Sequence, residues 1–485
     1  MNPGSIIGID LGTTYSLAAT IVQGQPTIIQ DMNGPVVIPS VVSIDDNGEL
    51  IVGETAKRQA LSKPQSTIYS VKRLMGRTLS ELGQEIASLP YLVEEKTTID
   101  GRKAVAVRLE NTLVTPEEIS AAILKEIAKR TGYPAKAVVT VPAYFDDSQR
   151  QATRDAGKLA GIDIVRIVNE PTAAALAYGL DRKRNGIVAV YDLGGGTFDC
   201  TILSIKDGVF KVLSTRGDTR LGGDDFDRSL MSLAQIKTPN IKNPNSPAFV
   251  QSLREAAELA KKRLSSIETT DIYWIDPETN KKYSVCITKN DFENCINSMI
   301  EKTLEKCSQA LRDAKIKPDE VDEVVLVGGS SRIPLVQQKV QQFFGRKPHT
   351  KLNPDEVVAL GAAIQGDILA GHRKQMLLLD VVPLSLGIET LGGAISKLIH
   401  RNSPLPARAT ERFSTGVDNQ TAVKINIFQG ERELTKDCRK LGELKLSGIP
   451  PMPAQMAQVD VTFLVDANGM LTCLLYTSDA ADEGL

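Results

Sequence analysis

The chain has 485 residues, which at roughly 150 residues per domain suggests about three domain-sized units. Lys and Arg together number 57 against 59 for Asp and Glu, and this near-neutral balance argues against a nucleic-acid coat or a polybasic membrane-surface protein. No apolar run reaches the ~18 residues that a membrane span needs, and the start of the chain lacks a signal-peptide profile. We therefore expect a cytoplasmic protein with no membrane or nucleic-acid partner.

The six cysteines are widely spaced, and no C-x-x-C pair occurs. This spacing predicts free thiols in a reducing compartment, because a metal site or a disulfide framework needs closer or paired cysteines. Three scattered histidines are too few for a metal cluster or a proton relay.

The segments IIGIDLGTTYSLAATIV (6–22) and IVAVYDLGGGTFDCTILSI (187–205) share one design. In each, a β-branched strand ends at an Asp, a Gly/Thr turn follows, and a second apolar run leaves the turn. The pattern predicts two strand–turn–strand units. Their separation of about 180 residues indicates a duplicated lobe rather than a solenoid, whose repeats are shorter.

The two turns suit a phosphate ligand. Glycines let the backbone come close to a ligand, and consecutive N–H groups form a concavity for anionic oxygens. Two such turns facing each other would hold a phosphate chain from both sides, whereas ordinary hairpins, the alternative, would not explain the repetition. Asp10 and Asp192 end the two strands, and a carboxylate aimed at phosphates implies Mg²⁺ held through water. The chain has no G-x-x-x-x-G-K-[ST] string, so the site is not of the Walker type.

Two segments lie between the repeats. Residues 138–157 predict a strand ending at Pro142 and then a helix that opens near Asp147. Residues 168–180 predict a helix whose alanines allow it to pack closely against a neighbour. Glu170 opens this helix, and favouring the helix dipole is a sufficient structural reason for it.

A third glycine turn lies in residues 323–344. A Val/Leu strand leads into Gly328, Gly329, Ser330, Ser331 and Arg332, and a helix follows, a layout that suits ligand contact at a helix N-terminus. Arg332 could stack on a base or pair with phosphate, or it could be an ordinary surface residue.

The pattern changes near Met376. An apolar stretch, MLLLDVVPLSLG, precedes alternating segments such as 422–428 and 458–465, and Asp466–Gly469 is a hairpin signal. We predict a small antiparallel β domain reached through a leucine connector. Because an apolar connector must be buried, we expect it to dock against the first lobe in one state and to be freed in another, with permanent burial as the alternative.

These segments together resemble the seventy-kilodalton heat-shock chaperones of the DnaK type. The resemblance covers about residues 5–472 and rests on IIGIDLGTTYS, VPAYFDDSQRQATRDAG, NEPTAAALAYGL, DLGGGTFD, LGGDDFD, VGGSSRIP, LLLD and VPLSLGIET. Residues 428–454 and the compact segment 230–257 are similar to the HscA branch, which helps to transfer iron–sulfur clusters from a scaffold protein.

The resemblance implies an α/β fold, a duplicated actin-like ATPase domain over residues 1–375, followed by the linker 376–380 and a small, C-terminally truncated antiparallel β-sandwich over 381–472. It implies ATP and ADP binding with Mg²⁺ and K⁺, and slow ATP hydrolysis that controls peptide binding and release, here in iron–sulfur cluster assembly. A general DnaK-type folding chaperone is the alternative, and a sugar or acetate kinase or an actin-like filament protein would share only the ATPase fold. The implied partners are extended hydrophobic peptides of client proteins, an iron–sulfur scaffold protein, a J-domain co-chaperone and a nucleotide exchange factor.

The family motifs also imply residue roles. Catalysis falls to Lys72, which positions the attacking water, and to Glu170, Thr197 and Asp199; the magnesium carboxylates are Asp10 and Asp192, with Asp10 and Asp199 near potassium. The implied nucleotide-binding residues are Gly12, Thr13, Thr14, Tyr15, Gly194, Gly195, Gly196, Thr197, Glu258, Lys261, Lys262, Ser265, Gly328, Gly329, Ser330, Arg332 and Asp355. An interdomain relay is implied for Pro142, Arg150, Leu377, Leu378, Leu379 and Asp380. A peptide cleft is implied for Ile388, Leu391, Phe413, Val423 and Ile425.

The end of the sequence departs from this pattern. After Thr472 the chain reads CLLYTSDAADEGL, which matches neither the family nor an alternating strand. We expect a non-family tail over 473–485, no helical lid, and a β domain that lacks one strand and exposes an edge.

Overall fold

The computed structural model describes residues 6–97, 103–180, 185–238, 241, 243–350 and 352–478. Its first central sheet is built on the hairpin that the sequence predicts. β1 (Ile6–Leu11) pairs antiparallel with β2 (Tyr15–Val22) and parallel with β13 (Lys136–Val141). The sheet is completed by β14 (Asp163–Asn169), β3 (Gln25–Ile28) and β6 (Val37–Pro39).

The second central sheet repeats this arrangement. β15 (Gly186–Leu193) pairs antiparallel with β16 (Phe198–Lys206) and parallel with β20 (Glu323–Val327). The same unit, a hairpin with a parallel strand beside its first member, therefore occurs twice, as the sequence repeat predicted. β17 (Val209–Asp218) and β21 (Leu377–Leu379) extend the sheet beyond β16.

Two helices join the lobes. α10 (Val357–Leu369) packs on β1 and β2, α5 (Glu170–Leu180) packs on β15 and β16, and the two helices pack on each other. Small side chains make this approach possible, since a Cβ added at Gly361 would lie 1.7 Å from the carbonyl oxygen of Ala173. The close packing predicted for the alanine-rich helix is confirmed.

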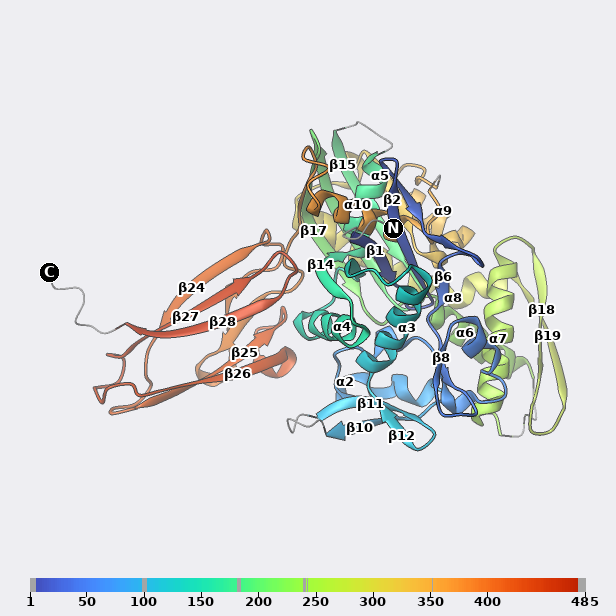
Figure 1. Cartoon of the computed structure of the whole chain (residues 1–485), viewed down its shortest axis with the longest axis horizontal. Helices are drawn as coiled ribbons and strands as arrows, with labels where there is room; N and C mark the ends of the chain where they lie inside the picture. Colours follow the sequence, from blue (N-terminus) through green and yellow to red (C-terminus); the bar gives the residue numbers. More distant parts are fainter. Residues whose placement is uncertain are drawn as a thin grey trace.

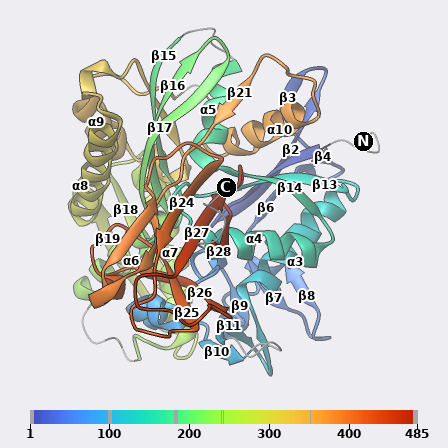
Figure 2. The same cartoon turned by 90° about the vertical axis from the view of Figure 1, so that its left-hand side faces the viewer.

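The other elements surround these sheets (Figures 1 and 2). The predicted start of α4 (Asp147–Ala160) is confirmed, because the Asp146 carboxylate caps it by accepting the N–H of Gln149 at 3.0 Å. The remaining helices are α1 (Glu54–Arg58), α2 (Leu79–Leu82), α3 (Pro116–Arg130), α6 (Gly223–Lys237), α7 (Pro247–Leu264), α8 (Lys289–Ala314) and α9 (Pro334–Phe344). The smaller sheets comprise β4 (Gln30–Asp31) and β5 (Gly34–Pro35); β7 (Val42–Ile44), β8 (Leu50–Val52) and β9 (Thr67–Ile68); β10 (Val93–Thr97), β11 (Lys103–Leu109) and β12 (Thr112–Val114); and β18 (Thr269–Ile275) and β19 (Lys282–Thr288).

The C-terminal part of the chain forms two antiparallel sheets, drawn in orange and red in Figure 1. Apolar side chains of both sheets, among them Ile388, Ile425 and Phe463, meet in one hydrophobic cluster. One sheet has the order β23 (Ile395–Ile399), β22 (Leu386–Glu389), β25 (Ala422–Gln429) and β26 (Arg439–Ser447), and the other has β24 (Ala407–Phe413), β27 (Gln458–Val465) and β28 (Leu471–Ser478).

β28 corrects the expectation of a missing strand. Residues 471–478 pair along the whole of β27, and the predicted hairpin turn Asp466–Gly469 joins the two strands. The alternating residues Leu471, Cys473 and Leu475 pack against the shared hydrophobic cluster. The segment CLLYTS has an ordinary period-two pattern that the sequence interpretation overlooked, so no strand is lost at this edge. The rest of the expected tail, residues 479–485, lies outside the described part of the chain.

The leucine connector is also placed differently from the expectation. β21 pairs in parallel with β17, so the connector adds an edge strand to the sheet of the second lobe rather than docking on the first. Leu378 packs against the cluster that joins the lobes, whereas Leu377 stays half exposed. Backbone pairing explains why the connector lies beside β17. It satisfies the N–H and C=O groups of this apolar segment as well as covering its side chains.

Candidate functional site

The two predicted glycine turns meet between the lobes. The turn 12–14 joins β1 to β2, and the turn 194–197 joins β15 to β16. A Cβ added at Gly195 would lie 2.1 Å from Thr14 Oγ1, and one at Gly196 would lie 2.8 Å from Thr13 Cγ2. Only residues without a side chain allow the turns to come this close, and their backbone N–H groups remain near one another for an anionic ligand.

Four carboxylates gather next to these turns, three of them buried and that of Asp10 partly buried. Asp10 and Asp192 are the last but one residues of β1 and β15, one position short of the predicted strand ends. Asp199 is the second residue of β16 and lies opposite Asp192, and Glu170 begins α5. Lys72, in the short 3-10 helix Val71–Arg73, forms an ion pair with Glu170, and both side chains are buried. Glu170 therefore does more than favour a helix dipole, because it holds the one ammonium in the group.

The acids of this group are strongly perturbed. Burial, with the charge of Glu170 adding to it and Lys72 opposing it, raises the pKa of Asp10 to about 7. Burial, with Glu170 again second, raises the pKa values of Asp192 and Asp199 well above their ordinary range. A surplus of buried negative charge of this kind is relieved by a cation, which fits the chemistry of a magnesium ion.

The carboxylates are held in place by neighbouring donors. Thr140 donates to Asp10 at 3.0 Å, and Asp199 accepts the backbone N–H groups of Ala143 and Tyr144 at 3.0 and 3.2 Å. Thr197, the last residue of the second turn, is buried and accepts the N–H of Gly194 through its carbonyl oxygen at 3.1 Å. Within the described residues, no group of three or more His, Cys, Asp or Glu side chains is arranged to coordinate a metal directly. A cation here would be held through water and phosphate oxygens, as Mg²⁺ usually is.

The third glycine turn contacts the second. Gly328 precedes the 3-10 helix Gly329–Arg332, and Ser330 donates to the carbonyl oxygen of Gly194 at 2.9 Å. Arg332 lies 2.7 Å from Asp355, and both side chains are about half exposed. This ion pair presents the flat guanidinium face that a nucleobase could stack on.

The predicted adenosine residues lie on the last two turns of α7 and just after it. Lys262 pairs with Glu258 at 2.6 Å, Lys261 pairs with Asp227 at 2.8 Å, and Ser265 donates to the carbonyl oxygen of Lys261 at 3.4 Å. Although burial alone would raise it, Lys262 and the neighbouring cations lower the pKa of Glu258 to about 2. Glu258 is therefore fully ionised at neutral pH.

A cavity with about 500 Å³ of empty space, part of it open to solvent, lies among these groups. Thr13, Thr14 and Tyr15 line it from the first lobe, and Asp224 and Glu258 line it from the second. Its size and its mixture of turns, charges and an aromatic ring suit a nucleotide.

The relay residues link this site to the β domain. Arg150, buried in α4, donates to the carbonyl oxygens of Ala143 and Asn468, each at 3.3 Å, and to Asn169 Oδ1 at 2.7 Å. Asn169 in turn donates to the linker residue Asp380 at 2.9 Å. Pro142 lies just after β13 and next to Ala143 in the chain. Pro142, Arg150 and Asp380 therefore lie along one connected path, whereas the three linker leucines pair with β17.

The predicted peptide-cleft residues are divided in the structure. Ile388 and Ile425 are buried in the cluster shared by the two sheets, and Phe413 packs against it, whereas Val423 packs with Ile449 and Val459 instead. The side chain of Leu391 lies outside the described part of the structure.

Sequence reasoning missed several polar residues of the site. Asp225 forms an ion pair with Arg73 across the lobes at 2.9 Å, and Asp224 accepts a hydrogen bond from Ser70 at 2.5 Å. The motif LGGDDFD contains both acids and Asp227, so the signal was present without an assigned role. Arg439, which pairs with Asp146 between the domains, carries no local signal.

Two related α/β lobes with phosphate-compatible turns and carboxylates between them are consistent with the class of actin-like ATPases, here joined to a β domain. A match to the Hsp70 protein family spans residues 6–482. The chain is 50% identical over 481 residues to the chaperone protein dnaK of Cyanidioschyzon merolae, covering 96% of this chain and 79% of that relative. It is 48% identical over 479 residues to the chaperone protein dnaK of Cyanidium caldarium, covering 96% of this chain and 77% of that relative. It is also 48% identical over 481 residues to the chaperone protein dnaK of Cyanophora paradoxa, covering 97% of this chain and 77% of that relative.

The chain therefore belongs to the Hsp70 family, and it is an ATP-hydrolysing chaperone of the DnaK type. No helix in the described part of the chain is long and apolar enough to cross a membrane. The family binds ATP and ADP with Mg²⁺, which agrees with the charge and the shape of the site between the lobes.

Proposed function

We propose that this chain is a general DnaK-type chaperone in which ATP hydrolysis between the lobes controls how the β domain holds extended apolar peptide segments. A continuous path of hydrogen bonds carries the proposal. Asp199 accepts the N–H of Ala143, and Arg150 donates both to the carbonyl oxygen of Ala143 and to that of Asn468 in the β domain. A change at the γ-phosphate site that moves the backbone near Ala143 therefore reaches the β domain through a single side chain.

The proposal carries over the residue roles that the family resemblance implies, and the observed contacts are compatible with them. Lys72 positions the attacking water, and Glu170 fixes the Lys72 ammonium by the ion pair described above. Backbone N–H groups of the glycine turns, with Thr13, Thr14 and Thr197, bind the phosphates. Asp10 and Asp192 would hold Mg²⁺ through its waters, and the ion would neutralise phosphate charge; Asp10 and Asp199 would hold K⁺. Because Lys72 is a point charge and a poor base, hydrolysis is slow. Slow hydrolysis suits a reaction that times the binding and release of peptide.

Peptide-stimulated ATP turnover is the decisive measurement. We expect basal turnover well below the ~10 s⁻¹ typical of enzymes, acceleration by unfolded peptides and a J-domain protein, and faster peptide release in ATP than in ADP. A nucleotide exchange factor should accelerate ADP release. Phosphorylation of a small sugar without release of inorganic phosphate would identify a kinase of the same fold instead.

A role in iron–sulfur cluster assembly was the narrower prediction from residues 428–454 and 230–257. The three relatives all carry the dnaK name, and none supports the HscA branch. We therefore favour the general chaperone, and comparing the affinity for an iron–sulfur scaffold peptide with that for generic unfolded peptides separates the two roles. Clearly tighter binding of the scaffold peptide would restore the narrower role.

A further inference from the structure

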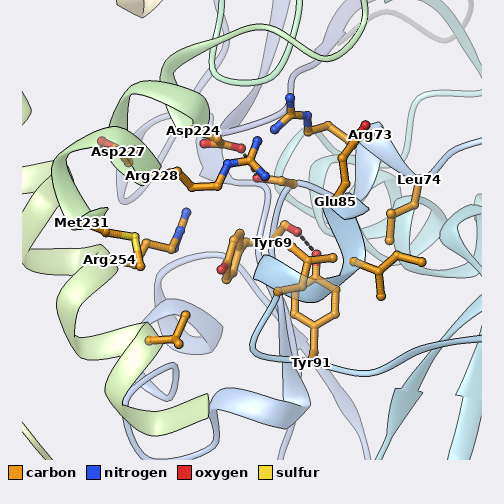
Figure 3. A pocket seen from close by; sticks show the side chains of 14 residues that line it. Tyr69, Arg73, Leu74, Glu85, Tyr91, Asp224, Asp227, Arg228, Met231 and Arg254 are labelled. Atoms are coloured by element: carbon orange, nitrogen blue, oxygen red, sulfur yellow. Dashed lines mark hydrogen bonds between the residues drawn. The ribbon is translucent and has the colours of Figure 1, made fainter. Parts of the chain in front are cut away.

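A second cavity lies beside the nucleotide cavity, between the same two lobes (Figure 3). It contains about 590 Å³ of empty space, part of it open to solvent. The two cavities share Tyr69, Ser70, Asp224 and Arg254, so these residues form the partition between them. We call the second cavity the Tyr69 cavity.

The walls of the Tyr69 cavity are largely apolar. Leu74, Leu89 and Tyr91 line it from the first lobe, and Met231 and Val250 line it from α6 and α7 of the second. The Tyr91 hydroxyl donates to the carbonyl oxygen of Tyr69 at 2.6 Å, as the dashed line in Figure 3 shows. That hydrogen bond satisfies its polar atom, so the Tyr91 ring acts as an aromatic wall.

The acids that line the cavity are already paired. Asp224 accepts from Ser70, Asp227 pairs with Lys261 at 2.8 Å, and Glu85 pairs with Arg77 and Arg220 at 3.5 and 3.1 Å. Cations therefore offset much of the charge of Asp227 and Glu85, whereas Asp224, whose partner is a neutral hydroxyl, keeps a charge that acts on Arg254 and Arg73.

Arg254 differs from these groups. Its guanidinium carbon lies 3.4 Å from the centre of the Tyr69 ring, a stacked arrangement. Among the residues that the structure describes, Arg254 has no ion pair and no hydrogen bond, and Nε of the neighbouring Arg73 is buried without a hydrogen-bond partner. The donors of the Arg254 guanidinium thus remain available at an apolar, aromatic cavity.

We propose that the Tyr69 cavity is a second ligand site, which takes a small aromatic carboxylate. The carboxylate accepts the forked N–H donors of Arg254, and the ring system lies against Tyr91, Leu89 and Met231. The site is distinct from the nucleotide cavity, so it can be filled while nucleotide is bound.

Titration calorimetry with 1-naphthoate on the full chain, saturated with ADP and Mg²⁺, tests this site. We expect saturable binding that 1-naphthalenemethanol, the neutral counterpart, does not reproduce. Arg254→Gln should weaken naphthoate binding by about tenfold or more, because a charge-assisted hydrogen-bonded pair is lost. Arg263→Gln, which changes an exposed arginine on the same helix, should bind as the wild type does.

A cavity-filling variant keeps the test valid if Arg254→Gln unfolds the lobe. Met231→Trp should abolish naphthoate binding and leave ADP affinity unchanged, since Met231 lines the Tyr69 cavity and not the nucleotide cavity. Both lobes line the cavity, so naphthoate and ADP should each raise the affinity for the other by the same factor. Displacement of naphthoate by ADP, or wild-type binding by both Arg254→Gln and Met231→Trp, would overturn the proposal.

Discussion

At the residue scale, the site combines three buried carboxylates and the partly buried Asp10 with a single buried ammonium. Asp10, Asp192, Asp199 and Glu170 come from four separate elements, and Lys72 is the counter-charge in contact with one of them. Such an arrangement is costly without a ligand, because buried ionised acids repel one another. The surplus charge accordingly favours a bound cation, and it adds to burial, the main cause, in raising the pKa values of Asp10, Asp192 and Asp199.

Lys72→Ala should lower ATP turnover at least about 100-fold while leaving nucleotide affinity nearly unchanged, because the ammonium acts on the attacking water rather than on adenosine. Single-turnover hydrolysis and fluorescent-ADP titration measure the two effects. Lys63→Ala, which removes a lysine paired with the exposed Asp46, is the matched control. Unchanged turnover in Lys72→Ala would remove this residue from the mechanism.

Asp227 gives a pH signature. Burial, partly offset by Lys261, raises the pKa of Asp227 from 3.8 to about 6. The folded state therefore holds its proton more tightly than the unfolded chain, so ionisation costs stability as the pH rises from about 4 to about 6. In denaturant unfolding of the nucleotide-free protein, the free energy of unfolding of the wild type relative to Asp227→Asn should fall by about 1 kcal/mol from about pH 5 to pH 7.5. A parallel pH dependence of the two proteins would contradict this.

At the scale of elements, short sequence motifs correctly predicted those features that depend on neighbouring residues in the chain. The two glycine turns, the α4 start and the alanine-rich α5 follow from short motifs, and the duplicated sheets follow from the repetition of β1–β2 in β15–β16. Placement of the leucine connector on β17 depends on an edge that lies more than a hundred residues away in the sequence, so its motif could not reveal it. Cross-lobe pairs such as Tyr69 with Arg254 were hidden for the same reason.

Gly361→Ala tests the joint between α5 and α10. The added Cβ would overlap the carbonyl oxygen of Ala173, and overpacking of this kind costs about 1–3 kcal/mol or more. We expect a thermal unfolding midpoint several degrees lower and weaker nucleotide binding, because the joint sets the angle between the lobes. Gly442→Ala, where nothing lies within 4 Å of the added Cβ, should change neither property. Equal midpoints for the two variants would show that the helices can move apart freely.

At the scale of the whole molecule, the β domain is docked on both lobes, as Figures 1 and 2 show. Arg439 pairs with Asp146 and lies 3.4 Å from Glu81 in the first lobe, and Arg401 lies 2.9 Å from Asp313 in the second. The Asp466–Gly469 turn adds hydrogen bonds to Ile167 and Arg166. Polar, partly exposed contacts of this kind suit an interface that forms and separates.

Arg401→Glu should undock the β domain, because it places like charges next to Asp313 and Glu431. We expect a larger radius of gyration by X-ray scattering and faster hydrogen exchange in β17 and β21. Adding Asp313→Arg should restore at least part of the docking, whereas Lys445→Glu, at an exposed position of β26, should have no effect. Compact scattering from Arg401→Glu would mean that the contacts of the first lobe suffice.

The parallel pairing of β21 with β17 has a consequence for proteolysis. A protease must take its target as a free extended segment, yet the Leu377 N–H is bound to the carbonyl oxygen of Gly208 at 3.1 Å. The scissile bonds of this leucine-rich joint become available only while β21 is out of the sheet. The rate of proteolytic cleavage at this linker would therefore report how often β21 separates from β17.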